Sequence, residues 1–161
     1  MKEHNTPQPP LTLRGGEELK IIKAAAAIIT KGDLFLITKR MARSPMGHCW
    51  EFPGGKIEAG ETVEECIVRE CREEIDVTVK PLRRVKDLWY DYPHGRIHLY
   101  FVLCELVSGT LRAVECSDFR WIKVEEFPKF EFPPADVGVI EELMTNAFEA
   151  PAQSPASDPS S

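Results

Sequence analysis

The stretch Gly55–Val77 reads GKIEAGETVEECIVRECREEIDV, and it decides the fold of the chain. Thr62 is followed three residues later by Glu65, which is the spacing of a capping box and marks the start of a helix. At about 100° per residue, apolar side chains return to one face of this helix as far as Ile75. The stretch therefore predicts a helix over Thr62–Ile75. Its expected apolar arc comprises Val63, Ile67, Val68, Cys71 and Ile75.

Three carboxylates, Glu70, Glu73 and Glu74, border this apolar arc at spacings of three and four residues. Like charges at these spacings repel one another, so the cluster costs energy unless a cation compensates it. Hard divalent ions such as Mg²⁺ prefer oxygen ligands of this kind; a solvated acidic face is the alternative. Arg69, four residues before Glu73, either orients that carboxylate or forms an ordinary surface pair. The helical spacing places Glu65, Arg69, Arg72 and Asp76 on the solvated side.

Strands are expected on both sides of this helix. The apolar run Ile21–Thr30 and the alternating run Asp33–Lys39 flank the turn Lys31-Gly32, which predicts a hairpin. Met41–Trp50 is expected to be a loop, and Glu51–Gly55 is a breaker cluster that neither a helix nor a central strand accepts. The order of elements predicts an α/β fold with a mixed sheet. Further strands are predicted at Val77–Leu82, Val85–Tyr90, His98–Leu106, Thr110–Ala113 and Phe119–Val124, and a closing helix at Pro134–Ala147.

Both ends of the chain differ from its middle in composition. Residues 1–18 are rich in Pro, Gly and polar side chains, and residues 149–161 are almost entirely Pro, Ser, Ala and Asp. Such segments bury too little apolar surface to offset the entropy of ordering. We expect one folded domain over residues 19–148 between two flexible tails.

Composition excludes several classes of protein. The 161 residues carry a formal net charge of −6, which argues against polymeric DNA or RNA as the main partner because phosphate contacts require a surplus of Lys and Arg. No apolar run reaches the ~20 residues of a membrane span. The amino terminus has no apolar core typical of a signal peptide, so the expected location is the cytoplasm.

The thiols and imidazoles show no spacing typical of a metal site. The five cysteines form no CxxC pair, and we expect reduced thiols that pack as small hydrophobes rather than a redox or zinc role. His48, His94 and His98 have no paired spacing either. The segment Tyr90–His94 is expected to be a loop, with a lid over a ligand as the alternative.

The pattern that begins at Gly55 resembles the signature of the Nudix family. It has five residues between Gly55 and Glu61, seven more before Arg69, and then Glu70, Glu73 and Glu74 in the family's positions. At roughly 5–7% usage per residue type, chance agreement is on the order of 10⁻⁸ per starting position. The one departure is Asp76, where the family has Gly; Asp tolerates a left-handed backbone at a modest penalty, so we expect intact metal binding.

The resemblance implies a Nudix α/β/α sandwich, with a mixed sheet between helices, and looks closest to the MutT-like branch. That branch implies an enzyme that cleaves nucleoside triphosphates to monophosphate and pyrophosphate, some members acting on oxidised guanine nucleotides. It implies a small nucleotide substrate, with the oligomeric state left open, and Mg²⁺ as cofactor with Mn²⁺ as substitute. The implied metal ligands are the Gly54 carbonyl, Glu70, Glu73, Glu74 and Glu115, with Arg69 among the catalytic group.

The resemblance leaves alternatives open for the general base, for the position of Glu115 and for the role of Arg40. Either Glu73 or Glu115 is the general base, and Asp118 competes with Glu115 for its position. Arg40 is expected to bind phosphate or ribose, with an ordinary surface charge as the alternative. Glu51, in the motif's lead-in segment, is expected to contact substrate.

The nucleobase site is expected near Phe52 and Asp136. Phe52 and the apolar face near Ile22–Ala26 are candidates to pack on a base, with a core role as the alternative. MutT-like proteins have Asn where this chain has Asp136. An ionised Asp only accepts hydrogen bonds, which favours base edges that present N–H donors, such as cytosine or guanine. Helix capping is the alternative role of Asp136.

Other functions within and outside the family remain as alternatives. Dinucleoside polyphosphates, CTP-type substrates and ADP-ribose require the same chemistry, and Phe132–Asp136 favours triphosphates. A non-catalytic nucleotide-binding module would lose glutamates that this chain keeps. The recognition domain of an adenine glycosylase is remote, because the chain lacks the large catalytic part.

Overall fold

The long strand β3 (Lys20–Lys31) lies at the centre of a mixed sheet in the computed structural model, which describes residues 13–14, 17–18, 20–93 and 95–145. The strands run in the order β5-β4-β3-β8-β7, with β6 paired to β3 and β9 to β4. The β3–β8 pair is parallel, and the other pairs of this sheet are antiparallel. The other strands are β4 (Leu34–Lys39), β5 (Trp50–Glu51), β6 (Gly54–Lys56), β7 (Thr78–Tyr92), β8 (Gly95–Ser108) and β9 (Asp118–Lys123).

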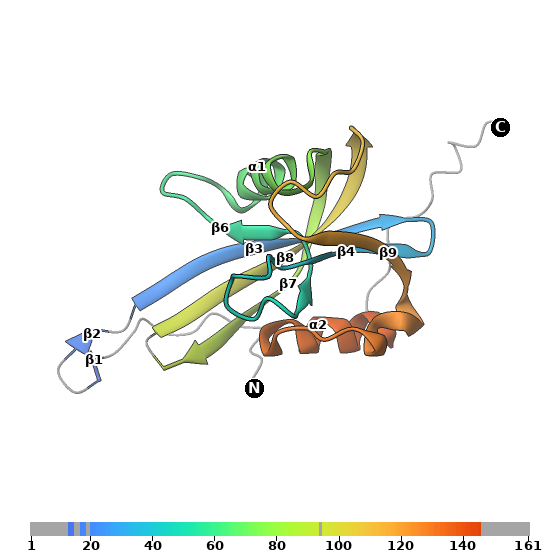
Figure 1. Cartoon of the computed structure of the whole chain (residues 1–161). Helices are drawn as coiled ribbons and strands as arrows, with labels where there is room; N and C mark the ends of the chain where they lie inside the picture. Colours follow the sequence, from blue (N-terminus) through green and yellow to red (C-terminus); the bar gives the residue numbers. More distant parts are fainter. Residues whose placement is uncertain (1–12, 15–16, 19, 94, 146–161) are drawn as a thin grey trace.

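Helices cover both faces of this sheet (Figure 1). Helix α1 (Val63–Ile75) lies on one face, and α2 (Pro134–Met144) with the 3₁₀ helix η1 (Val124–Lys129) lies on the other. Each face has its own buried cluster, and β3 contributes to both because alternate side chains point to opposite faces. Ala24, Ala26 and Ile28 belong to the α2 side, and Ala25, Ala27 and Ile29 to the α1 side. The predicted α/β/α sandwich is confirmed.

The boundaries of α1 agree with the sequence prediction. Thr62 is the N-cap, and both hydrogen bonds of the capping box with Glu65 are present. At the other end Asp76 adopts the left-handed conformation, with φ of 60°, and its N–H donates to the Arg72 carbonyl. Asp76 therefore performs the backbone role of the glycine it replaces, and its carboxylate pairs with Arg112 at 3.1 Å.

The predicted strand Thr110–Ala113 is wrong, because this segment terminates the helix instead of joining the sheet. The N–H of Arg112 donates to the carbonyl of Ile75, and those of Val114 and Glu115 donate to the carbonyl of Glu74. The last carbonyls of a helix lack hydrogen-bond donors within the helix, and the backbone N–H groups of this loop supply those donors. It also brings Glu115 to the end of α1.

Several other elements differ from the sequence prediction. The two strands expected between Val77 and Tyr90 form one strand, β7, whose ladder with β8 has register shifts. β7 extends to Tyr92, so Tyr90 and Tyr92 lie in a strand rather than a loop, and His94 is outside the described residues. Gly54–Lys56 of the breaker cluster forms the short strand β6. The 3₁₀ helix η1 has no counterpart in the prediction.

The predicted tails lie mostly outside the described residues. Within the predicted amino-terminal tail, β1 (Leu13–Arg14) pairs antiparallel with β2 (Glu17–Glu18). The expected end of the closing helix at Ala147, and the tail over 149–161, lie outside the described residues. No helix in the described part of the chain is long and apolar enough to cross a membrane. All five cysteines are buried and free, as predicted.

Candidate active site

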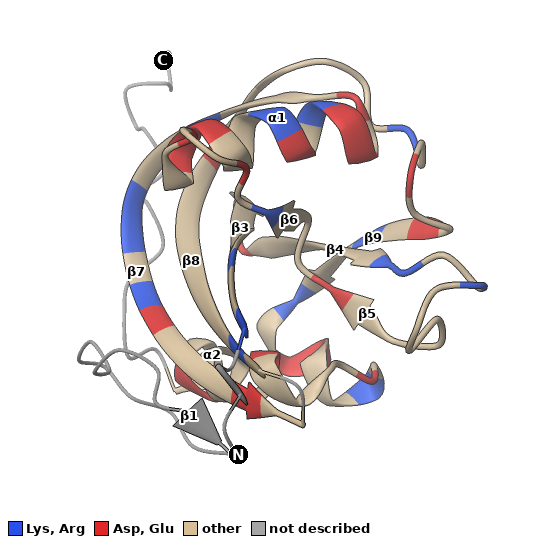
Figure 2. Ribbon diagram, turned by 90° about the vertical axis from the view of Figure 1, so that its left-hand side faces the viewer, with Lys and Arg blue, Asp and Glu red and all other residues tan. Residues whose placement is uncertain are grey.

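Two consecutive glycines allow α1 to lie directly against the backbone of β6. The N–H of Gly54 donates to the Glu74 carboxylate at 3.1 Å. A Cβ at Gly55 would stand 2.5 Å from the Glu70 carboxyl group, closer than real Cβ contacts allow. Figure 2 shows α1 lying across β6, with acidic residues along the helix. The glycines thus create a backbone cradle in which two carboxylates of α1 fit.

Arg69 holds the acidic residues of this cradle in place. Its guanidinium contacts Glu61 at 2.7 Å, Glu70 at 2.9 Å and Glu73 at 3.2 Å, and donates to the Lys56 carbonyl at 3.1 Å. These bonds raise the pKa of Arg69 and hold the pKa of Glu61 at about 2. The Arg69 side chain is only 23% exposed, so its predicted position on the solvated side is wrong. The helical period places Arg69 away from the apolar arc, but the Gly55–Glu61 loop folds over it.

Glu70 and Glu74 occupy an environment that disfavours their negative charge. Burial, together with the nearby carboxylates of Glu51, Glu70 and Glu115, raises the pKa of Glu74 to about 9. Burial also raises the pKa of Glu70, against the opposing effect of Arg69. Two neighbouring carboxyl groups whose charge is disfavoured by burial, and which offer only oxygen ligands, fit a hard divalent cation. Such a cation would return both groups to the ionised form.

Glu115 lies beside this cluster, whereas Asp118 does not. The N–H of Glu115 donates to the Glu74 carbonyl at 3.1 Å, and the Glu115 charge raises the pKa of both Glu70 and Glu74. Asp118 instead accepts from the backbone N–H of Phe119 at 2.8 Å. Of the two candidates left open by the sequence, the geometry favours Glu115.

A cleft of about 340 Å³ opens beside β6 and the amino-terminal end of α2. In its wall, Arg40 contacts Glu51 at 2.8 Å and also donates to the Pro45 carbonyl at 2.9 Å. The wall therefore combines an apolar floor from β3 and β8 with a few polar groups, as small-molecule sites do. The lining comprises Ala24, Ala25, Ala26, Arg40, Glu51, Phe52, Gly54, Gly55, Lys56, Ile97, Leu99, Pro133, Ala135 and Asp136.

Asp136 is a nearly buried carboxyl group in this wall. It is 6% exposed, and among the described residues its carboxyl group accepts and donates no hydrogen bond. Burial raises its pKa to about 8, and the Glu51 carboxylate contributes. This environment disfavours the ionised form that the sequence suggested, and a protonated carboxyl group both donates and accepts hydrogen bonds. Pro133 is the N-cap of α2, and Asp136 makes no capping bond.

A comparison with known protein families matches residues 20–143 to the NUDIX domain. This chain belongs to the Nudix family. It is 36% identical to an 8-oxo-dGTP diphosphatase of Escherichia coli K12, over 78% of this chain and 98% of that protein. It is 32% identical to the CTP pyrophosphohydrolase of the same organism, over 83% and 99%. A solved MutT structure, from work on Aliivibrio salmonicida and Vibrio cholerae, is 30% identical with a TM-score of 0.64, covering 77% of this chain and 96% of that one.

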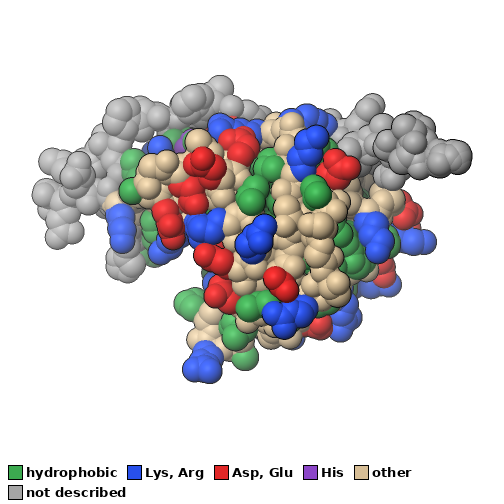
Figure 3. All heavy atoms as spheres, turned by 90° about the horizontal axis from the view of Figure 1, so that it is seen from above, with side chains coloured by type: hydrophobic (Ala, Val, Ile, Leu, Met, Phe, Trp, Pro, Cys, Tyr) green, Lys and Arg blue, Asp and Glu red, His purple; other side chains and the backbone are tan. Residues whose placement is uncertain are grey.

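This Nudix hydrolase thus has the fold of MutT-like pyrophosphohydrolases, and the family generally uses divalent metal ions and acts on small nucleotides. Its donor set agrees with that chemistry, since Glu70 and Glu74 lie together against Gly54 and Gly55, where burial disfavours their ionised forms unless a cation binds. The face that carries α1 shows acidic and basic side chains side by side (Figure 3), with no broad basic field of the kind that binds polymeric nucleic acid.

The Phe52 ring of this Nudix hydrolase is a core residue as well as part of the cleft wall. It is 3% exposed and packs on Phe101, Phe127 and Phe132, with ring centroids 5.9–6.2 Å apart. Glu61 was not among the predicted site residues, yet it is the partner of Arg69 closest in distance. The position of Glu61 in the family signature could have identified it as a site residue.

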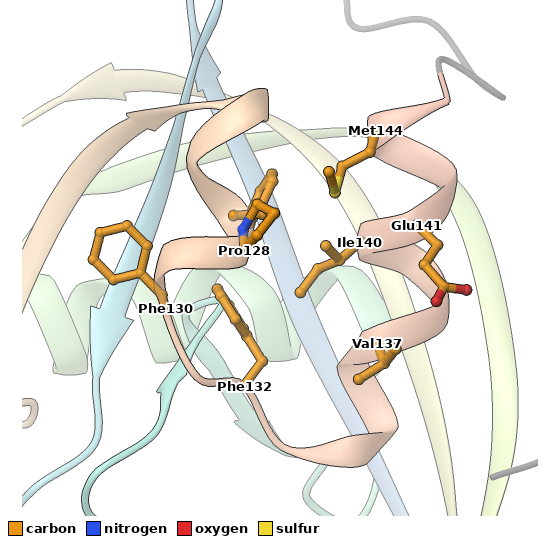
Figure 4. A pocket seen from close by; sticks show the side chains of 8 residues that line it. Pro128, Phe130, Phe132, Val137, Ile140, Glu141 and Met144 are labelled. Atoms are coloured by element: carbon orange, nitrogen blue, oxygen red, sulfur yellow. The ribbon is translucent and has the colours of Figure 1, made fainter.

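A second hollow, of about 180 Å³, lies between η1 and α2 (Figure 4). Phe130 and Phe132 stand on one side of it, and Val137, Ile140 and Met144 on the other. Among the described residues that line it, Glu141 alone is charged. This hollow has few polar groups with which to orient a nucleotide, so the cleft at Asp136 is the better candidate for the substrate.

Proposed function

We propose that this protein is a Mg²⁺-dependent, MutT-like hydrolase that converts nucleoside triphosphates to the monophosphate and pyrophosphate. The observation that carries the proposal is that Glu70 and Glu74 lie against Gly54 and Gly55, beside a cleft that ends at Asp136. The relatives named as 8-oxo-dGTP diphosphatase and CTP pyrophosphohydrolase support it, since both names describe nucleotide substrates. The cytoplasm, which contains free nucleotides and Mg²⁺, is the proposed location.

Glu70, Glu73, Glu74, Glu115 and the Gly54 carbonyl are the proposed ligands of Mg²⁺, with Mn²⁺ as substitute. When bound, the metal neutralises phosphate charge and makes a water molecule more acidic. Without such neutralisation, an acidic site of this kind repels a triphosphate.

In the proposed reaction the oxygen of a water molecule bonds to the β phosphorus, and the bond from that phosphorus to the α–β bridging oxygen breaks. The monophosphate leaves with the bridging oxygen, and the water oxygen remains in pyrophosphate. Glu73 or Glu115 accepts the water proton; both are exposed, and Arg69 orients Glu73. Arg40, held by Glu51 and still 30% exposed, is proposed to bind phosphate or ribose at the cleft.

Asp136 is proposed to recognise the base as a neutral carboxyl group. Its O–H donor and its carbonyl acceptor fit an edge that presents an acceptor next to a donor. Guanine offers O6 beside N1–H, and cytosine offers N3 beside its amino group, so both bases satisfy Asp136. The panel of substrates must therefore include both.

The test compares kcat/KM values, measured with Mg²⁺, for dGTP, 8-oxo-dGTP, CTP, dCTP and ADP-ribose, because this ratio reports discrimination in the transition state. The products of the reaction in H₂¹⁸O locate the bond that is cleaved. The proposal expects turnover of at least one triphosphate, with ¹⁸O in pyrophosphate. Absence of triphosphate turnover, or ¹⁸O in the monophosphate, would contradict it.

A further inference from the structure

Three potential metal ligands of different chemistry meet at the edge of the cleft, away from the carboxylates of α1. A ring nitrogen of His48, the thiol of Cys49 and a carboxylate oxygen of Glu131 all lie within 4.8 Å of one another. His48 Nε2 is already 3.3 Å from Glu131 Oε2. Tetrahedral zinc holds such atoms at about 2.0–2.3 Å, which places them about 3–4 Å apart. Side-chain shifts of about 1 Å close the site.

The backbone around these three residues is fixed by hydrogen bonds. The N–H of Arg40 donates to the Cys49 carbonyl at 3.0 Å, and the N–H of Trp50 donates to the Glu131 carbonyl at 2.7 Å. The Trp50 ring packs edge-on against Phe130, with 5.2 Å between the ring centroids. Residues next to the ligands are therefore locked together, which brings two chain segments about 80 residues apart in sequence to one point.

We propose that His48, Cys49 and Glu131 form a Zn²⁺ site with three protein ligands and an open fourth position. A thiolate, an imidazole and a carboxylate are the ligands that zinc takes, whereas Mg²⁺ takes oxygen ligands only. The site is therefore selective against the metal proposed for the carboxylate cluster, and it does not depend on the proposed hydrolase activity.

Two of the three side chains are exposed, and the third is buried. The side chains of His48 and Glu131 are 63% and 68% exposed, so both can turn toward an arriving ion. Cys49 is 2% exposed, and burial together with the Glu131 carboxylate raises the pKa of its thiol.

An ion at this position would join two chain segments that each lead to a residue of the cleft wall. Glu51, the partner of Arg40, follows Cys49 by two residues, and Asp136 follows Glu131 by five. Bound zinc would thus restrain the loop before β5. Arg43 is an exposed trypsin site in that loop, so zinc should slow cleavage after Arg43.

The decisive probe is Co²⁺, added to the full chain in excess Mg²⁺. A thiolate bound to Co²⁺ gives an intense sulfur-to-cobalt charge-transfer band, which carboxylate ligands do not give. We expect the band in the wild type, its loss in Cys49→Ser, and its displacement by Zn²⁺. His48→Ala and Glu131→Gln should each weaken Zn²⁺ binding at least about tenfold.

Glu125→Gln is the matched control, because Glu125 is exposed on η1 and should leave the band unchanged. The exposed position of His48 makes His48→Ala informative even where Cys49→Ser fails to fold. Absence of the band in the wild type, its persistence in Cys49→Ser, or wild-type Zn²⁺ affinity in His48→Ala would overturn the proposal. Unchanged tryptic cleavage at Arg43 in saturating Zn²⁺ would contradict the restraint of the loop.

Discussion

Replacing Asp136 by Asn should stabilise the protein at neutral and alkaline pH. The folded state raises the pKa of the Asp136 carboxyl from 3.8 to about 8. Below pH 3.8 both the folded and the unfolded chain carry this proton. Between pH 3.8 and about 8 the unfolded chain releases it while the folded chain retains it, so stability falls as pH rises through this window and levels off above it. Asn has nearly the same shape and does not ionise, so it removes this dependence.

The size of the effect follows from the burial of Asp136. Each pH unit in the window changes stability by at most about 1.4 kcal/mol. Asp136 borders the open cleft, and an unpaired polar group in such a position costs about 1–3 kcal/mol. We expect Asp136→Asn to gain about 1–3 kcal/mol on the wild type between pH 5 and pH 8. For a chain of 161 residues, each kcal/mol corresponds to about 2–4 °C in Tm.

The assay is thermal unfolding, followed by circular dichroism, of the wild type and Asp136→Asn at each pH unit from 5 to 8. Asp33→Asn is the control, because Asp33 is exposed in the turn between β3 and β4 and should follow the wild type. The Tm difference between Asp136→Asn and wild type should widen as pH rises. A difference that is constant over the whole range would refute the reasoning about Asp136.

Four further substitutions test the carboxylate cluster and the start of α1. Glu74→Gln should lower kcat at least about 100-fold, since loss of even an outer partner of a metal ligand costs 10–100-fold; a variant with wild-type kcat would argue for a binding module. Arg69→Lys should raise the Mg²⁺ concentration at half-maximal rate about tenfold, because Lys lacks the planar fork that joins several carboxylates. Gly55→Ala should displace the Glu70 carboxyl and weaken Mn²⁺ binding about 10–100-fold in a calorimetric titration. Thr62→Ala should remove the cap of α1 and cost about 1 kcal/mol in chemical unfolding; an unchanged midpoint would exclude a stabilising cap.

Local signals made α1 predictable from sequence. Thr62 and Glu65 satisfy each other within one turn, and the left-handed Asp76 replaces a glycine whose position the family signature defines. The same signature identified Glu70, Glu73 and Glu74. These features depend on residues close together in the chain, where spacing is enough to fix geometry.

The errors arose where distant segments decide the outcome. Arg112 donates its N–H to the end of α1 rather than to a strand, so the pattern of Thr110–Ala113 was misleading. Burial is the main cause of the raised pKa of Asp136, and such burial depends on tertiary structure. The meeting of Cys49 and Glu131 likewise depends on the packing of Trp50 against Phe130, which no spacing rule contains.

Anomalous scattering from a crystal grown with Mn²⁺ and a non-hydrolysable triphosphate would test the central claim most directly. We predict a manganese peak within ligand distance of Glu70, Glu73 and Glu74, with the triphosphate on its open side. A map in which these three carboxylates contact no metal while the nucleotide occupies the cleft would contradict the assignment of this helix as the metal site.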